Sequence, residues 1–192
     1  LGQSLVGGVE LVAPVELDRA VEFALGLHRP ARRIDARGHS QLLVRDRPGG
    51  KWRVVRSWNP LEQGRPVTFS RDGRSIVLLD NKGHDKARLL RLELATGKIT
   101  ALHADPRADL SRRALVNPDD LTVEAIGTHY LKLGWKVLDR RVRADFARLR
   151  KVARGGIFRV LNRSDDLSRW VVKVSGDVRP SRYYLYERRT GK

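Results

Sequence analysis

The 192-residue sequence contains no cysteine, which excludes disulfide bonds and thiolate metal sites. No stretch approaches the roughly 18 uncharged apolar residues that a membrane-spanning helix requires. The N-terminus lacks the basic start that is typical of a secretory signal. We therefore expect no membrane partner and a cytoplasmic location.

Motifs that carry catalytic or ligand-binding chemistry are also lacking. The sequence has no Gly-rich phosphate loop, no paired-His metal motif and no acidic calcium loop. The segment Gly38-His39-Ser40-Gln41-Leu42 begins like a nucleophile elbow, but Leu42 replaces the required glycine and the following pattern is that of a strand. Serines and histidines show no triad spacing, although triads form in space rather than in sequence order. We assign no catalytic, metal-binding or cofactor-binding residue and expect no cofactor.

Positive charge is present in excess. The chain has 39 Lys and Arg against 22 Asp and Glu, a formal net charge of +17. Such an excess favours polyanionic partners and salt-dependent binding. The cations are spread along the whole chain, and most are arginines in a background of Ala, Leu, Val and Gly. A biased coding composition therefore explains the charge as well as nucleic-acid binding does.

The segment from Val67 to Leu102 reads as four short apolar-rich strands separated by turns. Turn residues stand at Asp72-Gly73, at Asn81-Lys82-Gly83 and at Thr96-Gly97, where the backbone freedom of glycine suits tight turns. Four strands in a unit of this size are typical of one blade of a β-propeller.

Three sequence markers recur at intervals of 47 residues or twice that number. Strand-ending acids mark the first series, Gly-Lys dipeptides the second and turn aspartates the third. The members are Asp46, Glu93 and Glu187, with the strand-ending Asp139 beside the missing copy at position 140; Gly50-Lys51, Gly97-Lys98 and Gly191-Lys192; and Asp72, Asp119 and Asp166. A period of roughly 40 to 50 residues with four strands per unit favours a propeller over a helical solenoid. We therefore predict an all-β fold, a partial β-propeller of about three to four blades with one inserted α-helix.

The register divides the chain into five segments. Residues 1–33 do not fit the repeat: Leu5 to Val12 has a strand pattern, and Val15 to His28 weakly favours a helix or a further strand. Residues 34–64 form a partial blade and 65–110 a full one. Residues 111–155 form a blade whose last strand is replaced by a helix at 139–154, and 156–192 form a blade that lacks its last strand. With Leu at position 1 and a strand missing after Lys192, we expect a piece of a longer polypeptide.

The inserted helix is amphipathic. Its apolar residues Val142, Phe146, Leu149 and Ala153 share one face, with Asp139 as N-cap and Gly155 as C-terminal stop. Cations occupy the opposite side: Arg140, Arg141, Arg143, Arg148, Arg150, Lys151 and Arg154. One interpretation is a polyanion-binding surface, and the other is a structural helix with a solvated basic face. Asp145 and the absence of exposed aromatics weaken the first interpretation.

Several segments between residues 34 and 192 resemble the propeller domain of prolyl-oligopeptidase-family serine peptidases, in particular the acylaminoacyl-peptidase and dipeptidyl-peptidase-like bacterial branch. The most specific is Trp135-Lys136-Val137-Leu138-Asp139 followed by Val142, Ala144-Asp145-Phe146 and Leu149. The others are Asp72-Gly73-Arg74, Arg88-Leu89, Ala95-Thr96-Gly97-Lys98 and Arg182-Tyr183-Tyr184-Leu185-Tyr186.

The resemblance implies a non-catalytic propeller that restricts substrate access and scaffolds an α/β-hydrolase domain, so that short peptides reach a serine peptidase site in the parent protein. No catalytic residue of that family maps onto this chain, and family propellers have more blades than are counted here. A half propeller also has exposed edge strands, which favour self-association. The alternative function is a basic module that binds nucleic acid or another polyanion.

Overall fold

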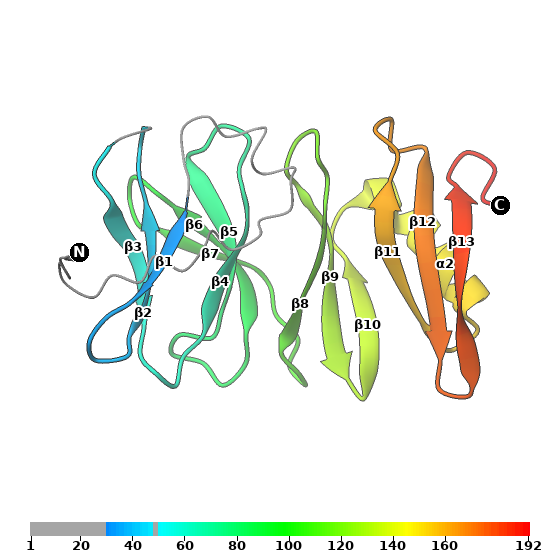
Figure 1. Cartoon of the computed structure of the whole chain (residues 1–192), viewed down its shortest axis with the longest axis horizontal. Helices are drawn as coiled ribbons and strands as arrows, with labels where there is room; N and C mark the ends of the chain where they lie inside the picture. Colours follow the sequence, from blue (N-terminus) through cyan, green and yellow to red (C-terminus); the bar gives the residue numbers. More distant parts are fainter. Residues whose placement is uncertain (1–29, 48–49) are drawn as a thin grey trace, which may run out of the picture. The chain divides into compact units, whose positions relative to one another are not determined.

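Short antiparallel strands are the main regular elements of the computed structural model, which describes residues 30–47 and 50–192 (Figure 1). The strands form four separate sheets, three with three strands and one with four. The expected N-terminal strand at 5–12 and helix at 15–28 lie outside the described residues. The described strands group into two compact units.

The first unit begins with a three-stranded sheet in the order β1-β2-β3. Its strands are β1 (Ala31–Ile34), β2 (Ser40–Val44) and β3 (Arg53–Trp58). Strand β1 starts at residue 31, three residues before the expected start of this partial blade. The β1–β2 turn contains Gly38 at φ 78°, a conformation that favours glycine.

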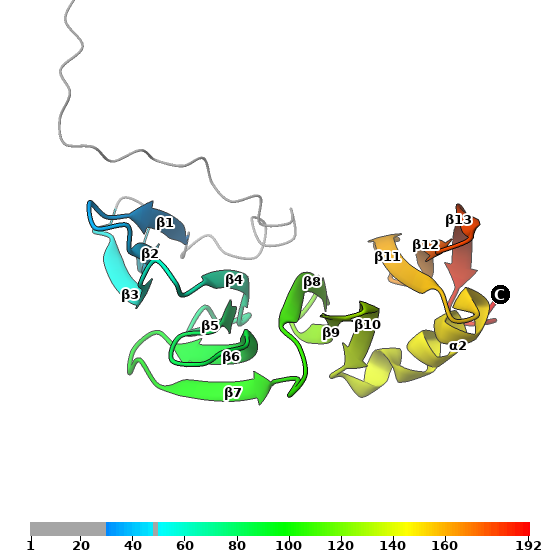
Figure 2. The same ribbon diagram turned by 90° about the horizontal axis from the view of Figure 1, so that it is seen from below.

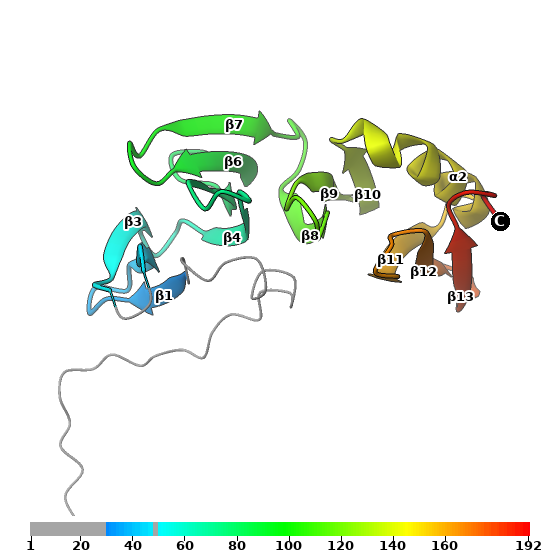
Figure 3. The ribbon, with the colours of Figure 1, turned by 90° about the horizontal axis from the view of Figure 1, so that it is seen from above.

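The same unit contains the four-stranded sheet β4-β5-β6-β7, and Figure 3 shows β6 and β7 side by side. The strands are β4 (Gly64–Phe69), β5 (Ser75–Asp80), β6 (Arg88–Glu93) and β7 (Ile99–His103). All six residues of β5 are buried, as suits an inner strand. This sheet is the segment from Val67 to Leu102 that the sequence identifies as one complete blade.

A shared core joins the two sheets of the first unit. Leu42, Val44 and Trp58 from the first sheet pack with Phe69 and Ile76 from the second. A polar contact reinforces this packing: Arg56 Nε on β3 donates to Asp80 Oδ2 on β5 at 2.6 Å. Asp80 is fully buried, so this ion pair lies away from solvent and compensates the desolvation of the carboxylate.

The second unit comprises Ser111–Asn117 and Val123–Lys192. Its first sheet has the order β10-β9-β8, with β8 (Leu110–Val116), β9 (Val123–Tyr130) and β10 (Lys132–Val137). A 3-10 helix η1 (Arg140–Val142) and helix α2 (Arg143–Ala153) follow β10, where the four-stranded blade has its last strand. The second sheet is β11 (Ile157–Arg163), β12 (Arg169–Gly176) and β13 (Arg179–Glu187). Helix α2 runs along this second sheet and contacts β11 and β12 (Figure 2).

Turns with the same hydrogen bonds recur between corresponding strands. The carboxylates of Asp72, Asp120 and Asp166 each accept the backbone N–H two residues further on. The residue after each aspartate has positive φ: 68° at Gly73, 60° at Leu121 and 56° at Leu167. The middle copy of this turn is therefore centred on Asp120, one residue after the sequence marker Asp119.

The two Thr-Gly-Lys turns also share their bonding. The hydroxyls of Thr96 and Thr190 donate to the carboxylates of Glu93 and Glu187, at 3.0 and 3.4 Å. The backbone N–H of each glutamate donates to the carbonyl of the lysine that closes its turn. Strands β6 and β13 thus end in equivalent turns, although β13 has no following strand among the described residues.

The predicted fold class, an all-β partial propeller with one inserted helix, is confirmed by these four antiparallel sheets and one α-helix. Within residues 30–47 and 50–192, no helix has the length and apolar character needed to cross a membrane.

The close contact between Gly64 and Trp58 generates a prediction about stability. A Cβ at Gly64 would lie 1.9 Å from the indole ring of Trp58, which is buried in the core of the first unit. We expect Gly64→Ala to lower the free energy of unfolding by about 2 to 3 kcal/mol because the ring must shift. Urea denaturation followed by tryptophan fluorescence measures the change.

Gly134→Ala is the matched control, since a Cβ there meets its nearest atom at 3.8 Å without positive φ. Equal unfolding free energies for the two variants would contradict the proposed tight packing at Gly64.

Candidate functional site

The inserted helical segment begins at an aspartate cap. Asp139 Oδ1 accepts the backbone N–H of Arg141 at 2.8 Å, and its Oδ2 accepts from the Arg141 side chain. The helix α2 ends where Arg154 adopts φ 45° and Gly155 adopts φ 82°. The cap and the stop predicted from the sequence therefore bound the helical segment, with the cap acting on η1 at its start.

One face of the helix is buried against the sheet β11-β12-β13. Phe146 lies at its centre, with ring centroids 5.4 Å from Phe158, 5.6 Å from Trp135 and 6.3 Å from Trp170. These rings meet edge to face, a favourable arrangement for aromatic pairs. The predicted apolar residues are all buried in this cluster: Val142, Phe146, Leu149 and Ala153.

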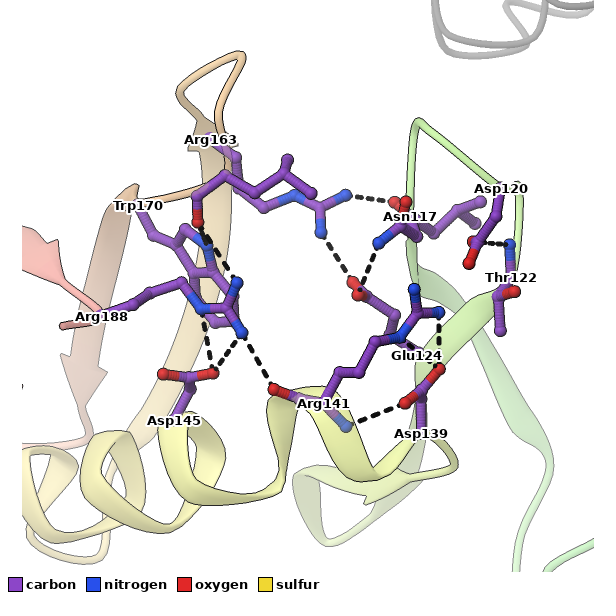
Figure 4. Close-up of polar contacts among 12 residues, drawn as sticks. Asn117, Asp120, Thr122, Glu124, Asp139, Arg141, Asp145, Arg163, Trp170 and Arg188 are labelled. Atoms are coloured by element: carbon purple, nitrogen blue, oxygen red, sulfur yellow. Dashed lines mark hydrogen bonds and ion pairs between the residues drawn. The ribbon is translucent and has the colours of Figure 1, made fainter.

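A buried carboxylate on the same helix fastens it to β13. Asp145 Oδ1 accepts a hydrogen bond from the Tyr186 hydroxyl at 2.8 Å, and Asp145 Oδ2 accepts one from Arg188 Nη2 at 2.9 Å. The Arg188 guanidinium also lies 5.0 Å from the ring centroid of Trp170 and donates to the Arg141 carbonyl (Figure 4). Burial, together with the hydrogen bond to Asp145, raises the pKa of Tyr186, so this phenol stays a donor.

A second buried carboxylate joins β9 to β11. Glu124 Oε2 accepts from Arg163 Nη1 at 2.6 Å, and Glu124 Oε1 accepts from the Asn117 amide at 3.1 Å (Figure 4). Arg163 also donates to the Val116 carbonyl. Trp135 Nε1 adds a further link, since it donates to the Phe158 carbonyl at 2.9 Å. Side chains therefore hold together two sheets that share no backbone ladder.

The seven cations proposed for polyanion binding are all exposed, but they divide into two groups. Arg141 pairs with Asp139, Arg148 donates to the Arg188 carbonyl at 3.3 Å, and Arg150 donates to the Trp135 carbonyl at 2.8 Å. These three side chains support the fold. The others make no side-chain hydrogen bond or ion pair with any described residue: Arg140, Arg143, Lys151 and Arg154. The structure thus does not present the seven as one free surface.

Two features of this site escaped the sequence analysis. In the sequence, Asp145 only weakens the polyanion-binding interpretation, whereas in the structure it is the buried anchor of the helix. Its one available sequence signal was an acidic residue between Ala144 and Phe146 in an otherwise basic helix. The distant partner Arg188 carried no such signal, because only folding brings β13 beside the helix.

The histidines that follow the turn glycines have structural surroundings. The backbone N–H of His39 donates to Asp35 Oδ1, and the His39 ring lies 3.3 Å from Asp35 Oδ2. His84 donates its backbone N–H to the Asn81 carbonyl. The two residues occupy the β1–β2 and β5–β6 turns.

Comparison with solved structures defines the class of this protein as a β-propeller segment. TolB from Acinetobacter baumannii aligns with a TM-score of 0.50 and 15% identity, over 85% of this chain and 39% of TolB. A structure from a study of two prolyl endopeptidases aligns with a TM-score of 0.51 and 14% identity, over 86% of this chain and 25% of that one. These identities support the fold alone.

Sequence comparison adds a more specific relative, a peptidase. Dipeptidyl aminopeptidase BIII from Pseudoxanthomonas mexicana is 33% identical over 126 residues, which are 66% of this chain and 18% of that protein. No family model matches the sequence. The matched part of the chain thus spans less than a fifth of the length of this relative. Together with the prolyl endopeptidase fold, the match confirms the resemblance to a propeller domain of the prolyl-oligopeptidase family.

The anchor at Asp145 generates a prediction. Asp145→Ala leaves the Tyr186 hydroxyl and the Arg188 guanidinium without their carboxylate, and loss of one partner of a buried ion pair is strongly destabilising. We expect a loss of about 3 kcal/mol in the free energy of unfolding. Urea denaturation followed by Trp fluorescence measures it.

Asp165→Ala is the control, because Asp165 is exposed and its side chain has no partner among the described residues. A loss for Asp145→Ala no larger than that of the control would show that the anchor contributes nothing to stability.

Proposed function

We propose that this chain is the non-catalytic propeller portion of a serine peptidase, where it scaffolds an α/β-hydrolase domain and restricts the substrates that reach it. The observation that carries the proposal is the 33% identity with dipeptidyl aminopeptidase BIII over 126 residues. The likeness to a prolyl endopeptidase in fold supports it.

The rigidity of the second unit fits a scaffolding role. Its helix is tied to β13 by Asp145 and to β10 by Arg150, while Arg163 ties β11 to β9. Each tie includes a charged group, and hydrogen bonds to charged groups are stronger than those between neutral groups. A propeller held in this way keeps a fixed opening, which excludes folded chains and long peptides but admits short ones.

The open edge of the last sheet is a second element of the proposal. Strand β13 pairs with β12 on one side and is the outer strand of a three-stranded sheet. Tyr183 and Leu185 are 63% and 61% exposed on this strand. Unprotected edges of this kind pair with further strands, so we propose that the isolated chain self-associates through β13.

Peptidase assays test the proposed role. The purified 192-residue chain is expected not to hydrolyse dipeptidyl p-nitroanilides, whereas a parent protein that carries this chain is expected to cleave them. The parent is also expected to cleave a long peptide with the same N-terminal dipeptide much more slowly. Asp145→Ala in the parent should reduce this discrimination, because a loosened blade widens the opening. The ratio of the two kcat/KM values is the measurement.

Hydrolysis of the reporter by the isolated chain would overturn the proposal, as would a parent protein that cleaves long and short peptides equally well.

Light scattering tests the proposed self-association through β13. We expect the isolated chain to form dimers or larger species, and we expect the double variant Tyr183→Lys/Leu185→Lys to shift it toward monomer, because edge lysines oppose strand pairing. Val178→Lys is the control: Val178 is 92% exposed but lies in the β12–β13 turn. A wild-type chain that is monomeric at all concentrations would contradict self-association.

A further inference from the structure

Beyond the end of helix α2, one face of the sheet β11-β12-β13 is left uncovered. Tyr184 and Tyr186 point to the same side of β13, since side chains alternate along a strand. Tyr186 lies under the helix and is 4% exposed, whereas Tyr184 lies past its last turn and is 38% exposed. A pocket of about 730 Å³ occupies this place, lined by the helix end, by β12 and β13 and by the turn between them.

Gly156 brings the helix end close to β12 and so forms one wall of the pocket. A Cβ at Gly156 would lie 2.5 Å from the Ser175 carbonyl oxygen, so only glycine permits this approach. The opposite end of the pocket is the β12–β13 turn. Backbone therefore forms these two ends of the pocket, and side chains from the helix, β12 and β13 line the rest.

Four cations line this pocket: Lys151 and Arg154 from the helix end, and Arg179 and Arg182 from β13. None of these four side chains forms a hydrogen bond or ion pair with any residue in 30–47 or 50–192. Asp177 is the one acidic residue of the lining. In contrast, Arg141, Arg148, Arg150, Arg163 and Arg188 of the same unit all have partners.

A purely structural role explains only part of this cluster. Lys151 and Arg154 stand at the C-terminus of the helix, where cations interact favourably with the helix dipole. Arg179 and Arg182 are strand residues and gain nothing from that dipole. Their mutual repulsion with the helix cations is unfavourable, and an anion in the pocket would relieve it.

We propose that this pocket binds a small oligoanion, a ligand with two or more phosphate or carboxylate groups. Three guanidinium groups suit such a ligand because each forms paired hydrogen bonds with phosphate or carboxylate oxygens. The volume falls in the range of about 300 to 1,000 Å³ that is usual for small-molecule sites. The Val174 and Tyr184 side chains give the pocket an apolar wall for the rest of the ligand. This site is independent of the peptidase proposal.

Calorimetry on the full 192-residue chain tests the site with two probes at low salt, ATP for phosphates and triglutamate for carboxylates. At least one probe is expected to bind, and the stronger one identifies the preferred anion. Arg179→Gln/Arg182→Gln is expected to weaken binding at least tenfold. Circular dichroism checks that the variant keeps its strand content.

The matched control is Arg140→Gln/Arg143→Gln, which removes the same charge from two exposed arginines of the helical segment that do not line the pocket and have no side-chain partner among the described residues. We expect less than a twofold change for this control. An equal loss in both double variants would show that net charge alone attracts the probe, and absence of binding by both probes at millimolar concentration would likewise overturn the proposal.

Discussion

Buried arginine–carboxylate pairs join neighbouring sheets in both units, and the rest of the structure depends on them. Within each unit the two sheets share no strand ladder, so side-chain contacts connect one sheet to the next. Arg56 with Asp80 makes this connection in the first unit, and Arg163 with Glu124 makes it in the second. Removing either member would leave a charge in a place without water, and a blade would then separate more easily from its neighbour.

The inserted helix also joins two sheets of the second unit, mainly through apolar packing. The sheet β8-β9-β10 is followed by a helix instead of a fourth strand, and the helix packs its apolar face on the next sheet. Asp145 fixes its rotation by binding Tyr186 on β13 and Arg188, which directly follows that strand. Because the helix ends at Ala153, it covers only part of that sheet, and the uncovered part becomes the cationic pocket.

The positive charge of the chain therefore has more than one role. Some arginines of the second unit complete the fold by binding carboxylates or backbone carbonyls, as Arg150 does at Trp135. Others, such as Arg179 and Arg182, remain without partners within the described residues and line one pocket. A surface count of cations would treat these two groups alike. Cations without a structural partner therefore gather at one end of the helix, where a ligand can bind them.

The sequence by itself determined the four strands between Val67 and Leu102, their turns and the inserted helix, because these depend on local patterns: turn residues near Gly73 and Gly97, and the apolar spacing from Val142 to Ala153. It placed the middle turn marker at Asp119, whereas the hydrogen bonds place that turn on Asp120, since a fixed period does not register a shift of one residue. Only the tertiary structure decided that Asp145 is a buried anchor and that Arg182 joins Lys151 at one pocket. These residues are far apart in sequence, and their proximity follows from packing between elements, which local patterns do not encode.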